Sequence, residues 1–111
     1  MKVTFAAAAS GRSYFEKLLH GLSAQDRAAI LAVFQDIEDY GLGAKGAEFR
    51  QIEGKLWEIK MRAPGGGYRF FYVLVSAGHM HVLHGYKKQG QKAPVKELKL
   101  ARRRLREVLE Q

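Results

Sequence analysis

Side chains that can act on a phosphodiester fall on three segments whose residue patterns predict β-strands, residues 56–62, 68–76 and 79–88. They are Lys60, Arg62, Arg69, His84, Tyr86 and Lys88. Because side chains alternate along a strand and neighbouring strands pair, we expect these groups to converge on one area of a sheet. Lysine and arginine stabilise the charge that develops during phosphoryl transfer, and histidine or tyrosine transfers protons. In RNA the 2′-hydroxyl can be the nucleophile, so we expect no metal ion or other cofactor.

Arg69 is the one charged residue in the otherwise apolar run 68–75, a pattern typical of a central strand covered on both faces. A guanidinium in such a strand either reaches water or is paired, because burying it alone is costly. Two roles are therefore open. Arg69 belongs to a cationic site, or it forms a salt bridge with Glu58 or Glu53.

The four histidines differ in what their positions indicate. His79 and His81 have the same-face spacing of a metal pair, but no third ligand stands at a suitable distance, so we expect an exposed pair and no metal site. His20 ends the first predicted helix, where its charge meets the helix dipole favourably, and we expect a structural role. His84 shares a predicted strand face with Tyr86, and we assign both to proton transfer.

The positive charge of the chain is concentrated in one segment. The 111 residues include 19 Lys and Arg against 11 Asp and Glu, a formal net charge of +8. Nine of these cations lie between Tyr86 and Arg106, where Glu97 is the only acidic residue, so this segment carries the whole excess. Such a concentration favours a polyanion or an acidic protein as the partner.

The first half of the chain predicts one strand and two helices. Residues 3–6 can form a short strand, and we expect this start to be a strand and turn, not a signal peptide. Ser13 and Ser23 each precede an acidic residue by three positions and predict two helix starts. The second helix is expected to end at Gly41.

The second half predicts a meander and a last helix. After an irregular connection, with Phe49 and Ile52 as buried anchors, three antiparallel strands follow, the first two joined by a Pro-Gly turn at 64–67. Apolar residues three and four apart predict a helix over 94–110 whose other face is basic. The resulting order, β-α-α-β-β-β-α, predicts an α+β fold in which helices pack on a small, largely antiparallel sheet.

Length and composition exclude several classes of protein. A chain of 111 residues is expected to form a single domain spanning residues 1–111. It contains no cysteine, which excludes disulfide frameworks and permits a reducing compartment. No run approaches the roughly 20 apolar residues that a membrane span needs, so we expect a cytoplasmic protein with no membrane partner.

Four short motifs follow one another along the second half of the chain: LWEIKMR at 56–62, YRFFY at 68–72, VLHGYKKQGQKAP at 82–94 and Ala-x-x-Arg at 101–104. In order and spacing they resemble the HigB-like, phage-derived branch of the RelE toxin superfamily, and the resemblance covers most of the chain. The His-Gly-aromatic-Lys-Lys segment followed by Gln-Lys-x-Pro is the most specific of the four.

The resemblance implies a RelE-like fold and a small ribonuclease toxin of a toxin–antitoxin pair, which cleaves mRNA, commonly on the ribosome, by 2′-hydroxyl attack. It also implies a cognate antitoxin, often a helix-turn-helix protein, that covers the basic surface. The implied catalytic residues are Lys60, Arg69 and Lys88. The other cations assigned to RNA binding are Arg62, Lys87, Lys92 and Lys96. Tyr86 is also placed to stack on a base, as aromatic residues do in RNA sites.

The chain departs from the family pattern at several positions. Glu58 stands where some RelE relatives have another basic residue, and Gly90 and Ala93 replace hydroxyl residues that could contact phosphate. The last helix has no tyrosine to serve as the base that some relatives use. Two other functions therefore stay open: a non-catalytic RNA- or ribosome-binding module, and an inactive relative whose basic helix binds an acidic protein.

Overall fold

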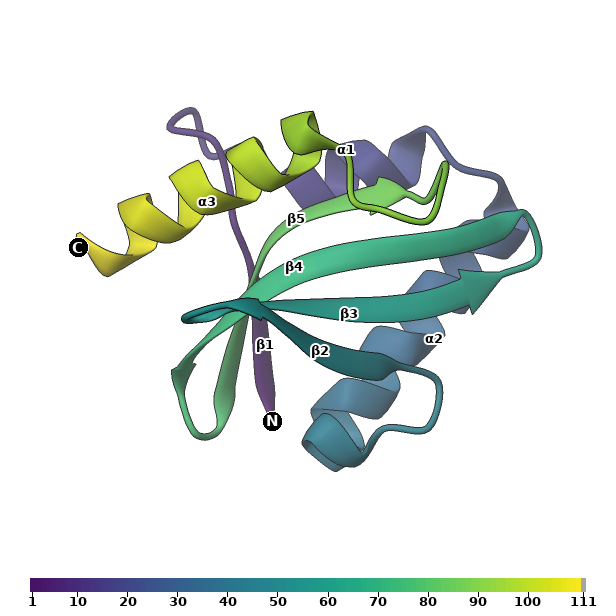
Figure 1. Ribbon diagram of the computed structural model, residues 1–111. Coiled ribbons are helices and arrows are strands. Elements are labelled where there is room, and N and C mark those ends of the chain that lie inside the picture. Colours follow the sequence, from purple (N-terminus) through teal and green to yellow (C-terminus); the bar gives the residue numbers. More distant parts are fainter. Residues whose placement is uncertain (111) are drawn as a thin grey trace.

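The structure, a computed structural model, describes residues 1–110 and shows an α+β fold with a five-stranded sheet packed by helices (Figure 1). The elements follow the order β1 (Lys2–Phe5), α1 (Tyr14–His20), α2 (Ala24–Tyr40), a short 3₁₀ turn (Gly41–Gly43), β2 (Glu48–Glu53), β3 (Leu56–Ala63), β4 (Gly66–Ser76), β5 (His79–Lys87) and α3 (Val95–Leu109). None of the helices within residues 1–110 is long and apolar enough to cross a bilayer.

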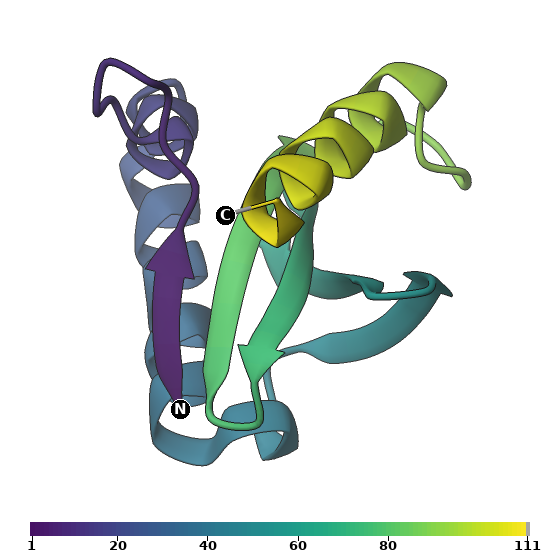
Figure 2. The ribbon, with the colours of Figure 1, turned by 90° about the vertical axis from the view of Figure 1, so that its left-hand side faces the viewer.

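The sheet has the strand order β1-β5-β4-β3-β2, which places β4 at its centre. β1 runs parallel to β5, with Val3 opposite Met80, whereas β2 to β5 pair antiparallel in sequence order. Figure 2 shows β1 beside β5 at the edge of the sheet that faces α2. The central position of β4 confirms the expectation from its apolar run, because its residues Tyr68 to Val73 are all buried.

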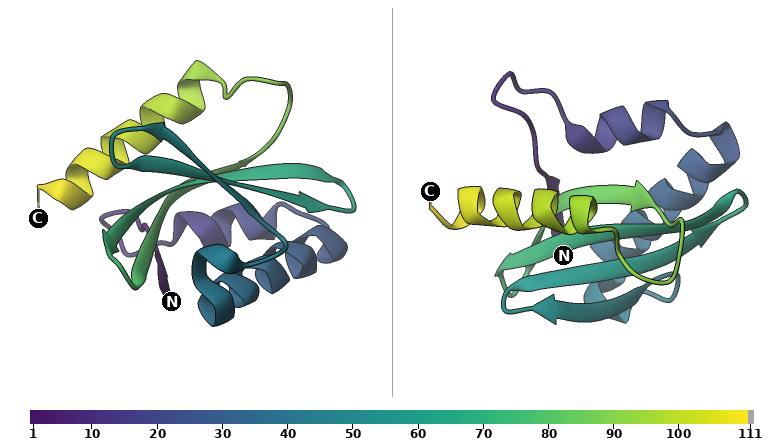
Figure 3. Two further views of the ribbon diagram at one scale, coloured as in Figure 1. Left: turned by 60° about the horizontal axis from the view of Figure 1, so that its bottom comes forward. Right: turned by 45° about the horizontal axis from the view of Figure 1, so that its top comes forward.

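Helices cover the two faces of the sheet separately. On one face α1 and α2 cover a core that includes Ile59, Phe70 and Tyr72, and on the other α3 covers a smaller core around Phe71 and Leu83. Figure 3 shows α3 crossing one side of the sheet and α2 lying on the opposite side. The three inner strands β3, β4 and β5 therefore send residues into both cores, as the period of two requires.

β2 is a strand that the sequence did not predict. We expected an irregular connection here with Phe49 and Ile52 as buried anchors, and these residues do pack partly against the two opposite cores. The other four residues of β2 are exposed, because the strand lies at the sheet edge and only one of its sides is hydrogen-bonded to a neighbour. A polar edge strand carries little of the apolar alternation that identifies strands.

Both predicted helix starts are confirmed. The Ser13 hydroxyl accepts a hydrogen bond from the backbone N–H of Glu16 at 3.2 Å, and the Ser23 hydroxyl accepts one from Asp26 at 3.1 Å. Each serine satisfies an amide that has no partner within its helix. Gly41 ends α2 with a φ of +61°, a conformation that favours glycine.

Asp26 joins the start of α2 to the turn between β3 and β4. Its carboxylate accepts one hydrogen bond from the backbone N–H of Gly65 at 2.7 Å and another from the Tyr68 hydroxyl at 2.6 Å. These two bonds, the Tyr68 bond first, lower the pKa of Asp26. Burial and the same bond raise the pKa of Tyr68 to about 12. A Cβ at Gly65 would clash with the carboxylate, so the turn fits against α2 only with glycine there.

Replacing Asp26 with asparagine should lower the thermal midpoint at pH 7 by several degrees, since an amide keeps only one acceptor oxygen for the two donors. Because the folded state depresses the pKa of Asp26, its contribution is complete above the usual value of 3.8 and is lost as the pH falls further. Thermal unfolding from pH 7 to pH 2.5 should show the two proteins converging in acid. Asp39→Asn, an exposed position on the same helix, is the control, and an equal loss there would contradict this role.

Candidate functional site

A broad hollow of about 890 Å³ opens where β3 and β4 extend past the end of β2. β2 pairs with β3 only from Glu48 opposite Lys60 onward, so the last three residues of β3 have no strand beside them on that side. Five cations line the hollow: Lys45, Lys60, Arg62, Arg69 and Lys88. Among the described residues of this lining, Glu48 supplies the one carboxylate.

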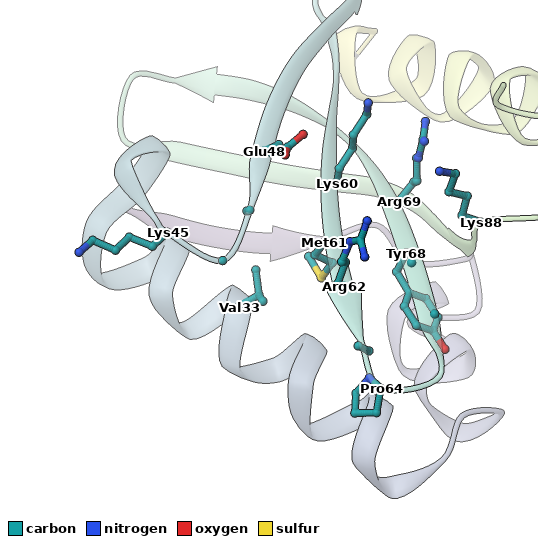
Figure 4. A pocket seen from close by; sticks show the side chains of 15 residues that line it. Val33, Lys45, Glu48, Lys60, Met61, Arg62, Pro64, Tyr68, Arg69 and Lys88 are labelled. Carbon is teal, nitrogen blue, oxygen red and sulfur yellow. The ribbon is translucent and has the colours of Figure 1, made fainter. Parts of the chain in front are cut away.

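Strand register brings the predicted catalytic residues together. Lys60 of β3 lies opposite Arg69 of β4, which lies opposite Tyr86 of β5. Lys88 follows the end of β5, and its backbone N–H donates to the carbonyl of Gly67 at 2.9 Å. Figure 4 shows Lys60, Arg69 and Lys88 pointing to the same side of the sheet, while Tyr68 points to the other. The expected convergence of these three cations is therefore present in the structure.

Gly67 forms the floor between the cations. It lies opposite Arg62 on β3 and is bonded to Lys88 on its other side, so it occupies the centre of this row. A Cβ built at Gly67 would meet the Lys88 side chain at 3.7 Å, an ordinary contact, so the fold itself does not require glycine here. Without a side chain, the position leaves room for a group to approach the backbone between two cations.

Arg69 is paired and still faces the hollow. Its side chain is 7% exposed, and Nη1 lies 3.4 Å from Oε1 of Glu58, a carboxylate with no exposed surface. Arg50 of β2, 56% exposed, reaches the same oxygen at 3.4 Å. Glu53, the other partner considered from the sequence, instead binds Arg102 of α3 at 2.7 Å. Arg69 is thus paired, with Glu58 as its partner, and it also lines the hollow.

Tyr86 is buried beside two other rings. Only 8% of its surface is exposed, and its ring stacks on Phe71 at 5.9 Å and on His84 at 6.2 Å. Burial, and next the charge of Glu58, raise the pKa of its hydroxyl, which therefore stays protonated at neutral pH. Tyr86 is not among the residues that line the hollow, and little of it is exposed. It offers no open platform on which a base could stack.

His84 contacts α3 and does not line the hollow. Arg104 donates from Nη1 to His84 Nδ1 at 3.0 Å, and the other ring nitrogen lies against the Glu97 carboxylate. Since arginine can only donate, Nδ1 accepts and Nε2 carries the proton that is donated to Glu97. Burial lowers the pKa of His84 against the opposing effect of Glu97, so the ring is neutral at neutral pH with both nitrogens engaged.

The cations assigned to RNA binding are spread over several surfaces. Arg62 lies in the hollow, whereas Lys87 leaves β5 from the other face, near Gly66 and the Asp26 carboxylate. Lys92 is exposed in the connection before α3. Lys96 lines a shallow groove on the outer side of α3, together with Val95, Lys99, Leu100 and Arg103.

Sequence reasoning missed three residues of this region. Lys45 and Glu48 line the hollow because the connection after α2 folds back to begin β2, and Arg50 reaches Glu58 from the same strand. All three depend on the unpredicted strand β2. The pairing of Glu48 with Lys60 across the two strands places them there, and alternation within β3 alone could not reveal it.

The chain matches the family model described as phage-derived protein Gp49-like (DUF891) over residues 17–106. This chain belongs to that family. The match spans every residue that lines the hollow. Gp49-like proteins form a RelE/HigB-like toxin family, which supports the role of toxin in a toxin–antitoxin pair and implies an antitoxin as partner. The RelE superfamily consists of ribonucleases. No curated protein matches the chain.

In this Gp49-like chain Arg104 fixes the last helix to the sheet. It is 8% exposed, donates to the Leu83 carbonyl at 3.0 Å as well as to His84, and lies 3.5 Å from the centre of the Tyr14 ring. Hydrogen bonds from charged groups and a desolvated cation–π contact each contribute on the order of 2 kcal/mol. The helix therefore docks through a polar network as well as through its apolar stripe.

Arg104→Ala should reduce the free energy of unfolding by about 3 kcal/mol, because the loss of two hydrogen bonds and the ring contact is partly offset when a guanidinium no longer has to be buried. Urea unfolding measures this loss, and NMR of His84 should show its pKa rising as the neighbouring charge disappears. Arg103→Ala, the adjacent exposed position, should change stability by no more than about 0.5 kcal/mol. Equal effects at the two positions would show that Arg104 does not hold α3.

Proposed function

We propose that this protein is an endoribonuclease toxin that cleaves mRNA in association with the ribosome. The observation that carries the proposal is the cluster of Lys60, Arg62, Arg69 and Lys88 around the bare backbone of Gly67. A phosphate above Gly67 would be surrounded by cations from two strands and the following connection. The membership in a RelE-type toxin family supports the same activity.

The reaction that suits this cluster is internal transesterification. The 2′-hydroxyl gives up its proton to water as its oxygen attacks the adjacent phosphorus, the bond to the 5′-oxygen breaks, and that oxygen takes up a proton. The products carry a 2′,3′-cyclic phosphate and a 5′-hydroxyl. The cations stabilise the additional negative charge on the phosphorane oxygens. Lys60 and Lys88 line the hollow on the same side of the sheet as Arg69, so we assign to their ammonium groups the transfer of a proton to the leaving 5′-oxygen.

The partners follow from the same proposal. We propose a cognate antitoxin with a helix-turn-helix domain and an acidic segment that neutralises the basic surface. Because mRNA and ribosomes are the targets, the proposed site of action is the cytoplasm. Growth restored by co-expression of a neighbouring helix-turn-helix reading frame tests the antitoxin, and arrest that persists despite complex formation would contradict it.

A second function, non-catalytic RNA binding, is favoured by one observation. His84 has both nitrogens engaged, and Tyr86 is buried with a raised pKa, so neither offers an open base to the hollow. A binding module would hold RNA through the same cations and leave it intact. Sequencing of RNA ends after incubation with ribosomes and with free mRNA separates the two functions.

Lys88→Met should reduce the rate of RNA cleavage at saturating RNA by about 100-fold, because one of the cations next to the reacting phosphate is lost. Growth arrest on induction should weaken in parallel. Lys55→Met, an exposed lysine in the turn between β2 and β3, is the control for loss of charge alone. Wild-type toxicity in Lys88→Met would contradict the assignment of this site.

Attack by the 2′-hydroxyl without a metal ion can be tested separately from the site residues. An RNA with a 2′-deoxy residue at the cleaved position should remain intact, because it lacks the nucleophile, and EDTA should leave the rate on ribosome-free RNA unchanged. Products with a 3′-phosphate derived from a cyclic phosphate and a free 5′-hydroxyl are expected. Cleavage of the 2′-deoxy substrate would contradict 2′-hydroxyl attack, and loss of cleavage of ribosome-free RNA in EDTA would contradict a metal-independent reaction.

The exposed cations before and on α3 should contribute affinity without contributing to the chemical step. Each phosphate contact contributes about 0.7 to the slope of log affinity for single-stranded RNA against log salt. For the double variant Lys92→Met/Lys96→Met we therefore expect the magnitude of this slope to decrease by about 1.4. The cleavage rate at saturating RNA should not change. Fluorescence anisotropy across a salt series measures the slope, and an unchanged slope would exclude both residues from the interface.

A further inference from the structure

Glu58 is a fully buried carboxylate beside the cationic hollow. It lies on β3 opposite Phe71 of β4, one row along the sheet from Lys60 and Arg69 and on the same face. Its Oε1 is shared by Arg50 and Arg69, each at 3.4 Å, whereas Oε2 is buried without a hydrogen-bond partner. A carboxylate with one unpartnered oxygen is an expensive group to bury in the middle of a sheet.

The contact geometry is not that of an ion pair optimised for stability. The strongest arginine–carboxylate pairs are bidentate and shorter, at about 2.7–2.9 Å. Here Arg69 donates to Glu58 from Nη1 only. Within residues 1–110, the buried nitrogen atoms that lack partners belong to Arg27 and Arg104, so the remaining N–H groups of Arg69 are not sealed inside the protein. They stay available on the side of the hollow, which Arg69 lines.

We propose that Glu58 is a positioning residue for Arg69. It holds one edge of the guanidinium and directs the free N–H groups towards a phosphate bound over Gly67. Its negative charge also offsets the repulsion among Arg50, Lys60 and Arg69, which otherwise opposes their approach. The inference rests on the proposed function, since the phosphate belongs to the RNA that is cleaved. Glu58 itself has no exposed surface and does not touch the substrate.

The substitution Glu58→Gln separates charge from shape. It removes the anion but keeps the size of the side chain and one acceptor oxygen. RNA affinity should stay equal or increase, because the cluster gains one net positive charge. The cleavage rate at saturating RNA should fall about tenfold or more, since small misplacements of a group at a reacting centre have effects of this size. A merely structural role predicts a lower thermal midpoint with an unchanged cleavage rate per folded molecule.

Two further variants control this experiment. Glu53→Gln breaks the exposed ion pair with Arg102 and should retain the wild-type rate, which shows that loss of a Glu–Arg pair alone is not sufficient. Glu58→Asp keeps the charge but shortens the reach by one methylene group, and it should cleave more slowly than wild type and faster than Glu58→Gln. If Glu58→Gln does not fold, this charge-preserving variant takes its place. A wild-type rate in a folded Glu58→Gln or Glu58→Asp protein overturns the proposal.

A measurement without RNA cleavage keeps the two proposals distinguishable. The guanidinium NMR signals of Arg69 should show slow rotation in the wild type and faster rotation in Glu58→Gln, while those of Arg102 should not change. If the wild type cleaves no RNA, the proposed function fails, and the Arg69 signals still decide whether Glu58 positions it. Identical Arg69 signals in the two proteins overturn the positioning role whatever the activity.

Discussion

The charge of Arg69 is the constraint on which this structure depends, because it lies on β4, the central strand of the sheet, which has a neighbour on both sides and a core on both faces. Water reaches only a small part of the side chain, so a buried anion has to accompany it. Glu58 supplies that anion from β3, and β5 closes the other side with Tyr86. An ion pair of this kind adds little stability compared with two packed apolar residues. The pair instead leaves the other N–H groups of Arg69 facing the hollow.

The face of the sheet on which α3 packs has two parts, an apolar part under the helix and a cationic part beside it. α3 covers the half that contains Phe71 and Leu83, and the contacts of Arg104 and His84 fix where the helix lies. The other half, around Gly67, is left uncovered and holds the cations of the hollow. The same polar contacts that dock the helix therefore occupy the histidine that the sequence suggested for proton transfer, which explains why His84 is absent from the hollow.

The sequence predicted the parts of the site that depend on alternation along a single strand. Ile59 faces the α2 core and Lys60 faces the hollow, as the period of two requires. The sequence-based prediction failed where the position of a residue depends on a second helix or strand. β2 was missed because its exposed residues carry no apolar pattern, and with it the contact of Arg50 with Glu58. The engagement of His84 by Arg104 could not be inferred either, since it depends on how α3 turns above the sheet.

The basic segment that dominates the composition does not act as one surface. Lys88 lies in the hollow, Lys87 leaves the opposite face, Arg104 is buried and Arg102 is paired with Glu53. The exposed cations that remain are Lys92, Lys96, Lys99, Arg103 and Arg106. These can attract a polyanion over a distance of about a Debye length, and none of them lines the hollow around Gly67. The basic segment is therefore divided between one cation in the hollow and several on the exposed surface, and the net charge does not distinguish them.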